Sequence, residues 1–311
     1  MGKALPIAAM PKSPSKLPSL ATLLTAQNIV FGGIIWSVFT FWFFALFSIA
    51  VPGEDSPLWY LLTTYLLETL PFCLAAWLCY RNWKSPQIAS GRDVWFFIGL
   101  GLASYAIANF LFGIWEVYFG LDPDISPADL FYIIFSVCVG WGMILAVLPR
   151  RLNLEPKQWL IIGGIAIFGT ILAVAVKYFA SLKPNVDEVV ITEAQWLINL
   201  DNFLSIFAFP VNMFYSIADV ALLIIGSTLL LAFWGGRFSI SWRMIAAAAL
   251  SKYVADLSLY VALSLPGNYE SGGLMDVFYV FCGVLYAIGA ALEYDVSTSR
   301  PSRGRRRRGA G

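Results

Sequence analysis

The sequence predicts an all-α membrane protein with eight transmembrane helices, arranged as two four-helix parallel repeats, with both termini cytoplasmic. Three observations lead to this prediction. The chain of 311 residues is 59% hydrophobic and only 13% charged, which lies outside the usual composition of a soluble domain. It contains eight apolar runs of transmembrane length, and its basic residues fall in alternate connections between these runs.

Each apolar run is long enough to cross about 30 Å of hydrocarbon, which takes about 20 helical residues. Because the bilayer core offers no water to the backbone, such runs must form helices. The expected spans are approximately 29–51, 58–80, 94–119, 130–148, 159–179, 211–234, 242–264 and 274–292.

Basic residues occur in every second connection and in both tails. They are Lys3, Lys12 and Lys16, then Arg81, Lys84 and Arg92, then Arg150, Arg151 and Lys157, then Arg237, and finally the arginines from Arg300 to Arg308. The other connections are mainly acidic, with Lys183 as the clear exception. By the positive-inside rule, both termini are expected in the cytoplasm. The net charge of +1 gives no global field that would favour nucleic acid as a partner.

Four segments are expected along the chain. Residues 1–26 form a disordered basic cytoplasmic tail, 27–150 the first four-helix half, 151–295 the second half, and 296–311 a basic cytoplasmic tail. Within the second half, residues near 192–209 begin with a capping box from Thr192 to Gln195. This stretch is expected to form a short helix on the outer membrane interface.

The second half repeats the spacing of the first. In each half, 14 residues separate the first two anchors and 20 separate the last two, the anchors being Trp95, Asn109 and Asp129, then Trp242, Asp256 and Asp276. The run DLFYIIFS at 129–136 also matches DVFYVFCG at 276–283. More loosely, YLLETLPF with Glu68 matches YSIADVAL with Asp219 if one residue is gapped. Halves of four helices run in the same direction, so we expect a pseudo-twofold axis along the membrane normal and a site between the halves.

Ionisable residues within the spans identify a candidate site. Glu68, Asp219 and Lys252 lie well inside their spans, and Asp256 follows Lys252 by one helical turn. Four ionised groups near the bilayer centre would cost on the order of 10 kcal/mol, so they should face one another or water. Lys252 and Asp256 are four residues apart and should pair.

Two roles are open for these residues. They either stabilise the packing of the helices through polar contacts, or they line an outward-facing cavity that binds a small ligand or an ion. The full set of candidate ligand-binding residues is Glu68, Asn109, Asp129, Tyr132, Asp219, Lys252, Asp256, Asp276 and Tyr279.

Several chemistries are disfavoured. The chain has no histidine, which removes the usual ligand of haem or zinc and the usual general base. We therefore expect no metal site and no cofactor. A retinal Schiff base at Lys252 is disfavoured because an eighth span follows and Tyr105 stands at the equivalent position. An intramembrane aspartyl protease using Asp219 and Asp256 is disfavoured because the expected glycine pattern is missing, so we expect no enzyme.

Two motifs carry a resemblance to a known family. The first motif is the run ISPADLFYIIFSVCVGWGMILAVLPRR at 125–151. The second is SWRMIAAAALSKYVADLSLY followed by DVFYVFCGVLYAIGAALE. Both resemble the eight-helix membrane sensor regions that precede bacterial diguanylate cyclase, phosphodiesterase and some kinase domains. The likeness covers residues 58–295. It implies a signal-input module whose pattern residues are Asp129, Tyr132, Asp256, Tyr260, Asp276 and Tyr279. Asn109 departs from the pattern, and no output domain is found in the chain.

The expected function is therefore a multi-pass sensor of the bacterial inner membrane, with an outward-facing polar pocket for an unknown small ligand or ion. Membrane lipids and a signalling partner in the cytoplasm or membrane are the expected partners. Two alternatives remain, a proton-coupled or ion-coupled transporter of small solutes and an accessory subunit of a larger membrane complex.

Overall fold

The computed structural model describes residues 24–48, 56–119, 125–148, 154–181, 195–233, 239–264 and 271–299. Within these ranges all regular structure is helical, which confirms the predicted all-α class. The elements are α2 (Ala26–Phe47), α3 (Leu58–Lys84), α4 (Arg92–Phe119), α5 (Asp129–Val147), α6 (Pro156–Ser181), α7 (Gln195–Ser205), α8 (Ala208–Ala232), α9 (Ser239–Ser264), the 3₁₀ helix η1 (Leu274–Asp276) and α10 (Val277–Thr298).

In this part of the chain, eight helices are long and apolar enough to cross a membrane, as predicted. Their ends differ from the predicted spans by a few residues. The helix α3 continues to Lys84, four residues past the predicted end. A prediction from hydropathy ends a span where the first charged residues appear. The helix itself continues, because basic residues in the last turn stabilise a helix C-terminus, and here these residues are Arg81 and Lys84.

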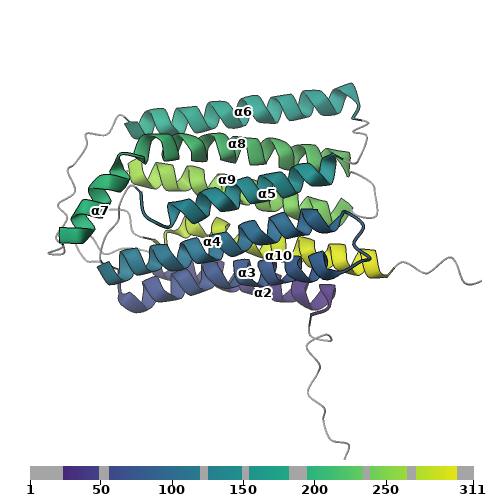
Figure 1. Ribbon diagram of the computed structural model, residues 1–311, viewed down its shortest axis with the longest axis horizontal. Coiled ribbons are helices and arrows are strands. Elements are labelled where there is room, and N and C mark those ends of the chain that lie inside the picture. The colour runs from purple at the N-terminus through teal and green to yellow at the C-terminus, as the bar shows by residue number, and fades with distance from the viewer. Residues whose placement is uncertain are drawn as a thin grey trace, which may run out of the picture.

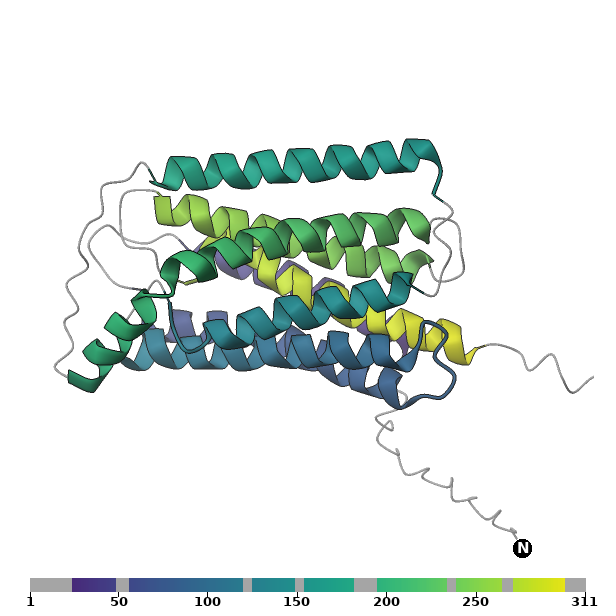
Figure 2. The ribbon, with the colours of Figure 1, turned by 45° about the horizontal axis from the view of Figure 1, so that its top comes forward.

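The eight long helices run side by side, as Figures 1 and 2 show. The start of α2 and the end of α10 lie at the same end of the bundle, and α7 lies at the opposite end. We call these the terminal end and the α7 end. The predicted tails, apart from residues 24–26 and 296–299, lie outside the described residues, and their cytoplasmic placement stays a prediction.

Neighbouring helices of each predicted half pack on one another, except that α2 packs mainly on α10 of the second half. In the first half α4 contacts both α3 and α5, and in the second half α9 contacts both α8 and α10. The halves are joined because α3 also packs on α10 and α5 on α8. The rings of Trp95 and Trp242 meet between α4 and α9 with centroids 6.1 Å apart. On the periphery, α2 packs on α10, and α6 packs on α8 and α9.

Two glycines allow close packing within the helix pairs. A Cβ atom at Gly142 of α5 would lie 3.0 Å from the carbonyl oxygen of Val94 on α4. A Cβ atom at Gly289 of α10 would lie 3.2 Å from the carbonyl oxygen of Ser241 on α9. Lipid tails are as apolar as the side chains, so the hydrophobic effect does not drive membrane helices together. Their association depends on close packing, which small residues allow because the backbones can approach.

The predicted interfacial helix corresponds to α7, which is shorter than the expected stretch near 192–209. Its predicted capping residue, Thr192, lies outside the described residues. Leu197 of α7 is fully buried and packs against Trp115 near the end of α4. Trp196 and Phe203 remain more than half exposed. The helix α7 therefore covers the end of α4 with one face and leaves aromatic side chains on the other.

The segment before η1 depends on Gly272. Its φ of +107° lies in the left-handed region, and a Cβ atom there would lie 2.7 Å from Cε1 of Tyr60. The Gly272 amide donates to Oδ2 of Asp276 at 2.8 Å, and the Tyr60 hydroxyl donates to the Gly272 carbonyl oxygen. This segment is thereby attached to α3 and closes the α7 end of α10.

Gly272→Ala is expected to lower the free energy of unfolding by about 1–3 kcal/mol, because alanine meets both backbone strain and the Tyr60 ring. Unfolding in mixed micelles with increasing SDS measures the loss. Gly273→Ala is the matched control, since Gly273 has a φ of −58° and its added Cβ would have its nearest neighbour at 3.8 Å. An equal loss in both variants would contradict the strain argument.

Candidate functional site

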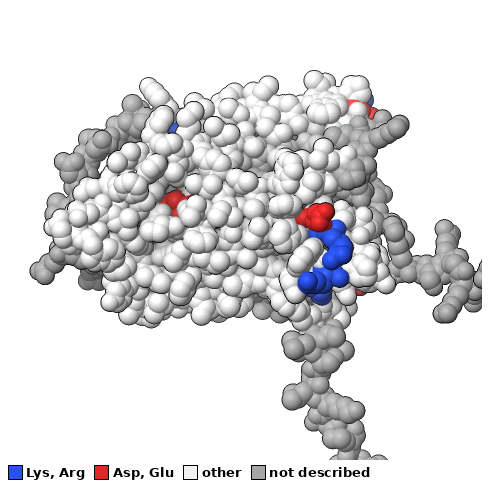
Figure 3. All heavy atoms as spheres, viewed as in Figure 1, with Lys and Arg blue, Asp and Glu red and all other residues white. Residues whose placement is uncertain are grey.

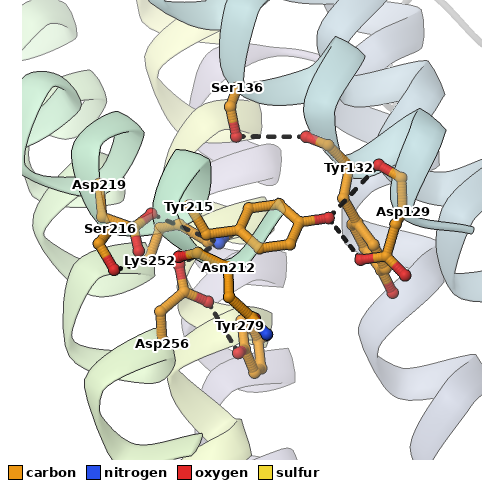
Figure 4. A network of polar contacts seen from close by, with 10 residues as sticks. All are labelled: Asp129, Tyr132, Ser136, Asn212, Tyr215, Ser216, Asp219, Lys252, Asp256 and Tyr279. Atoms are coloured by element: carbon orange, nitrogen blue, oxygen red, sulfur yellow. Dashed lines mark hydrogen bonds and ion pairs between the residues drawn. The ribbon is translucent and has the colours of Figure 1, made fainter. Parts of the chain in front are cut away.

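Four predicted residues meet in the second half of the protein and form a group that we call the lysine cluster (Figure 4). Lys252 of α9 donates to Asp256 one turn further along the same helix, as the spacing predicts. The Lys252 Nζ atom also lies 3.9 Å from Oδ1 of Asp219 on α8. The Tyr279 hydroxyl of α10 donates to Oδ1 of Asp256 at 2.8 Å. Three helices therefore contribute to one continuous polar contact.

Three further predicted residues meet in the first half and form the asparagine cluster. The Tyr132 hydroxyl of α5 donates to Oδ1 of Asn109 on α4 at 2.7 Å. Asn109 Nδ2 in turn donates to Oε2 of Glu68 on α3 at 3.4 Å. The tyrosine and its acceptor are 23 residues apart here and also in the pair of Tyr279 with Asp256. Asn109 thus occupies the place that an aspartate holds in the lysine cluster.

Aromatic rings fill the space between the two clusters. The Tyr105 ring lies 5.2 Å from the Tyr132 ring and 6.4 Å from the Tyr279 ring, measured between centroids. Tyr105 also packs against Phe135 of α5 at 5.0 Å, and Lys252 Nζ lies 6.0 Å from the Phe135 centroid. The Lys252 charge therefore faces an aromatic ring of the other half.

Asp129 connects the halves towards the α7 end of the bundle. Its carboxylate accepts from the Ser126 amide at 2.7 Å and from the Tyr215 hydroxyl at 2.6 Å. Tyr215 belongs to α8 and Asp129 to α5, so this hydrogen bond crosses from one half to the other (Figure 4).

The last predicted residue, Asp276, is held apart from the lysine cluster. It accepts from the Gly272 amide next to Tyr60 of α3. Nearby, Glu116 at the end of α4 accepts from the Tyr65 hydroxyl and, at 3.0 Å, from the Ser271 amide. Glu116 thus fastens the segment before η1 to α4, whereas the Asp276 contact lies within that segment.

The predicted site is therefore divided rather than single. The structure joins Asp219, Lys252, Asp256 and Tyr279 in one cluster, and Glu68, Asn109 and Tyr132 in another, with Asp129 and Asp276 in separate contacts. The five members of the two clusters that are not tyrosines are buried, and so is Asp276. Each has at most 9% of its surface exposed: Glu68, Asn109, Asp219, Lys252, Asp256 and Asp276. The outward-facing pocket stays a prediction.

Sequence reasoning left three participating tyrosines out of the site: Tyr65, Tyr105 and Tyr215. Tyr215 precedes Asp219 by four residues and thus shares its helix face, a signal that could have identified it. Tyr65 and Tyr215 are the first residues of the loosely matching runs YLLETLPF and YSIADVAL. Their hydroxyls donate to acids on different helices, Glu116 of α4 and Asp129 of α5. The correspondence of α3 with α8 thus gains no support from these contacts.

The lysine cluster has an uneven charge. If its three ionisable groups are all ionised, two carboxylates and one ammonium group leave one net negative charge in a buried site. An uncompensated charge away from water is costly, whereas one added proton or monovalent cation would balance it. Among the described residues, no three Cys, Asp or Glu side chains are arranged to hold a metal ion.

No known family model matches the chain, and no curated protein or solved structure is significantly similar to it.

Proposed function

We propose that the protein is a multi-pass membrane sensor in which a small ligand or an ion acts at the lysine cluster and changes how two four-helix halves pack. A partner protein would detect this change at the terminal end of the bundle. The proposal includes placement in the bacterial inner membrane with both termini cytoplasmic, which the loop charges and the family resemblance support. Enzymatic activity is not part of it.

One observation carries the proposal. The buried cluster of Asp219, Lys252 and Asp256 has a net charge of −1 when fully ionised, and it lies at the contact between the halves. Lys252 faces Phe135 of the first half, and Tyr215, one turn before Asp219, hydrogen-bonds to Asp129. A positive charge added at Asp219 can therefore act on α8, which makes the contact with α5.

The two-repeat arrangement is part of the same proposal. The paired contacts of Tyr132 with Asn109 and of Tyr279 with Asp256 support it, as do the close approaches at Gly142 and Gly289. A transporter is less well supported, because transporters commonly break helices near the bilayer centre. Here α3 is helical across Pro71, and the other seven described spans are continuous helices as well.

A distance measurement across the halves tests this function. Spin labels at Leu130→Cys on α5 and Met213→Cys on α8 would report the contact in nanodiscs, since both side chains are exposed. Cys73 and Cys138 are replaced by serine, while Cys79 and Cys282 are buried. We expect double electron–electron resonance to show that the distance between the two labels changes by a few ångströms when protons, Na⁺ or K⁺ are added.

Asp219→Asn is expected to abolish this shift, because it removes the net negative charge. Asp93→Asn is the matched control, since Asp93 is exposed at the start of α4, away from the cluster. An unchanged distance with all three cations would contradict the proposal. A sustained proton or cation flux into liposomes, lost in Asp219→Asn, would favour the transporter instead.

A further inference from the structure

A basic hollow lies at the terminal end of the bundle, far along the helices from the two polar clusters. It has a volume of about 530 Å³ and is formed between the last turns of α3 and α10. Trp77, Tyr80, Arg81 and Lys84 line it from α3, and Tyr294 and Thr298 line it from α10. Neither Asp nor Glu is among its lining residues. The hollow therefore carries two positive charges without an acidic neighbour in its wall.

Arg81 is held in place by neutral groups. Its guanidinium carbon lies 4.0 Å from the centre of the Tyr294 ring, and Nη1 donates to the Leu24 carbonyl oxygen at 3.3 Å. Its Nε atom is buried and has no hydrogen-bond partner in the described part of the chain. A buried donor without an acceptor is costly, and the planar guanidinium group suits a phosphate. An anionic ligand in the hollow would meet the Arg81 side chain, which lines it.

Lys84 lies at the exposed rim of the hollow. Its Nζ atom is 4.1 Å from the Trp83 ring centre and 5.5 Å from the Tyr80 ring centre. In this position the ammonium group rests on aromatic rings and keeps its three donors for another partner. Figure 3 shows basic side chains near this end of the molecule, with an acidic group beside them, while most of the rest of the visible face is uncharged.

The surroundings of the hollow indicate a lipid as the source of that anion. Trp77 and Tyr80 are about half exposed on the flank of a membrane-spanning helix, where aromatic residues mark the level of the lipid headgroups. The chain then continues beyond Thr298 with six arginines, at 300, 303 and 305–308. Basic residues next to a span attract anionic headgroups.

We propose that this hollow binds the phosphate headgroup of an anionic phospholipid. Arg81 and Lys84 contact the phosphate, and the acyl chains lie along the exposed Trp77 and Tyr80 side chains. This site is independent of the sensor function proposed above, because it shares no residue with the lysine cluster.

Native mass spectrometry of the full chain in detergent tests the proposal, with phosphatidylglycerol titrated against phosphatidylcholine. The wild-type protein is expected to prefer phosphatidylglycerol. Arg81→Gln and Lys84→Gln should each lower this preference about fivefold, which corresponds to about 1 kcal/mol per basic residue. Lys157→Gln is the matched control, because Lys157 is an exposed lysine at the start of α6 and does not line the hollow. It should retain the preference.

The competing outcomes are distinct. Equal binding of the two lipids by the wild-type protein overturns the proposal, and so does an equal loss in Lys157→Gln and Lys84→Gln. Lys84 is exposed, so its variant keeps the test valid if Arg81→Gln fails to fold. Displacement of phosphatidylglycerol by millimolar inorganic phosphate or glycerol phosphate would show a site for a soluble phosphate, which also overturns the lipid assignment.

Discussion

Replacing Lys252 by methionine is expected to lower the free energy of unfolding by about 3–5 kcal/mol near neutral pH. This range is typical when one partner of a buried ion pair is removed and its counter-charge stays behind. Lys252 hydrogen-bonds to Asp256 and lies 3.9 Å from Asp219, so the variant leaves two carboxylates facing each other. Unfolding in mixed micelles with increasing SDS measures the loss.

Additional substitutions in the lysine cluster separate the effect of charge from that of packing. Lys252→Met combined with Asp256→Asn and Asp219→Asn should recover most of the lost stability, because no charge then remains in the cluster. Asp219→Asn alone should have a small effect, since it leaves Lys252 and Asp256 as a neutral pair. If the triple variant is as unstable as Lys252→Met, packing and not charge determines the stability here. Lys157→Met at the exposed start of α6 serves as the control.

Gly142→Ala and Gly289→Ala are each expected to lower the free energy of unfolding by about 1–3 kcal/mol, as overpacking of a tight contact does. The added methyl group would lie 2.7 Å from Cγ1 of Ile98 in one case and from Cδ1 of Ile245 in the other. Backbone atoms 3.0–3.2 Å away prevent a simple rotamer change from relieving either contact. The same micelle unfolding assay reports both losses.

Gly164→Ala supplies a control of opposite sign. Gly164 lies in α6, and no atom lies within 4 Å of its added Cβ. Alanine is a better helix former than glycine, so stability should be unchanged or higher by up to about 1 kcal/mol. A loss in Gly164→Ala as large as that in Gly142→Ala would show that the close approach is not the cause. Similar losses at Gly142 and Gly289 would further support the proposed repeat.

The pairing of Lys252 with Asp256 was predictable from local sequence, whereas the division of the polar residues was not. The i,i+4 spacing fixes the pairing, because both side chains lie on one helix face. The placement of Glu68 with Asn109, apart from Asp219, depends on how α3 packs on α4 and α8 on α9. This packing explains why the structure has two buried clusters where the sequence predicts one pocket.

The basic hollow likewise could not be predicted from the sequence. Arg81 and Lys84 are visible in the sequence as charges next to a span, and Tyr294 follows more than 200 residues later. Only the contact of α3 with α10 brings the Tyr294 ring to the Arg81 guanidinium group. No local pattern in either segment indicates this pair.

The sequence by itself determined the helical class and the eight spans, because hydrocarbon forces an apolar run to satisfy its own backbone hydrogen bonds. The tertiary structure decided which helices touch and which polar side chains meet. In a bilayer, the lipid-facing and protein-facing sides of a helix are both apolar, so periodicity in the sequence does not show which face is buried. Close contacts such as those at Gly142 and Gly289, and polar pairs such as Tyr215 with Asp129, fix the helix faces instead.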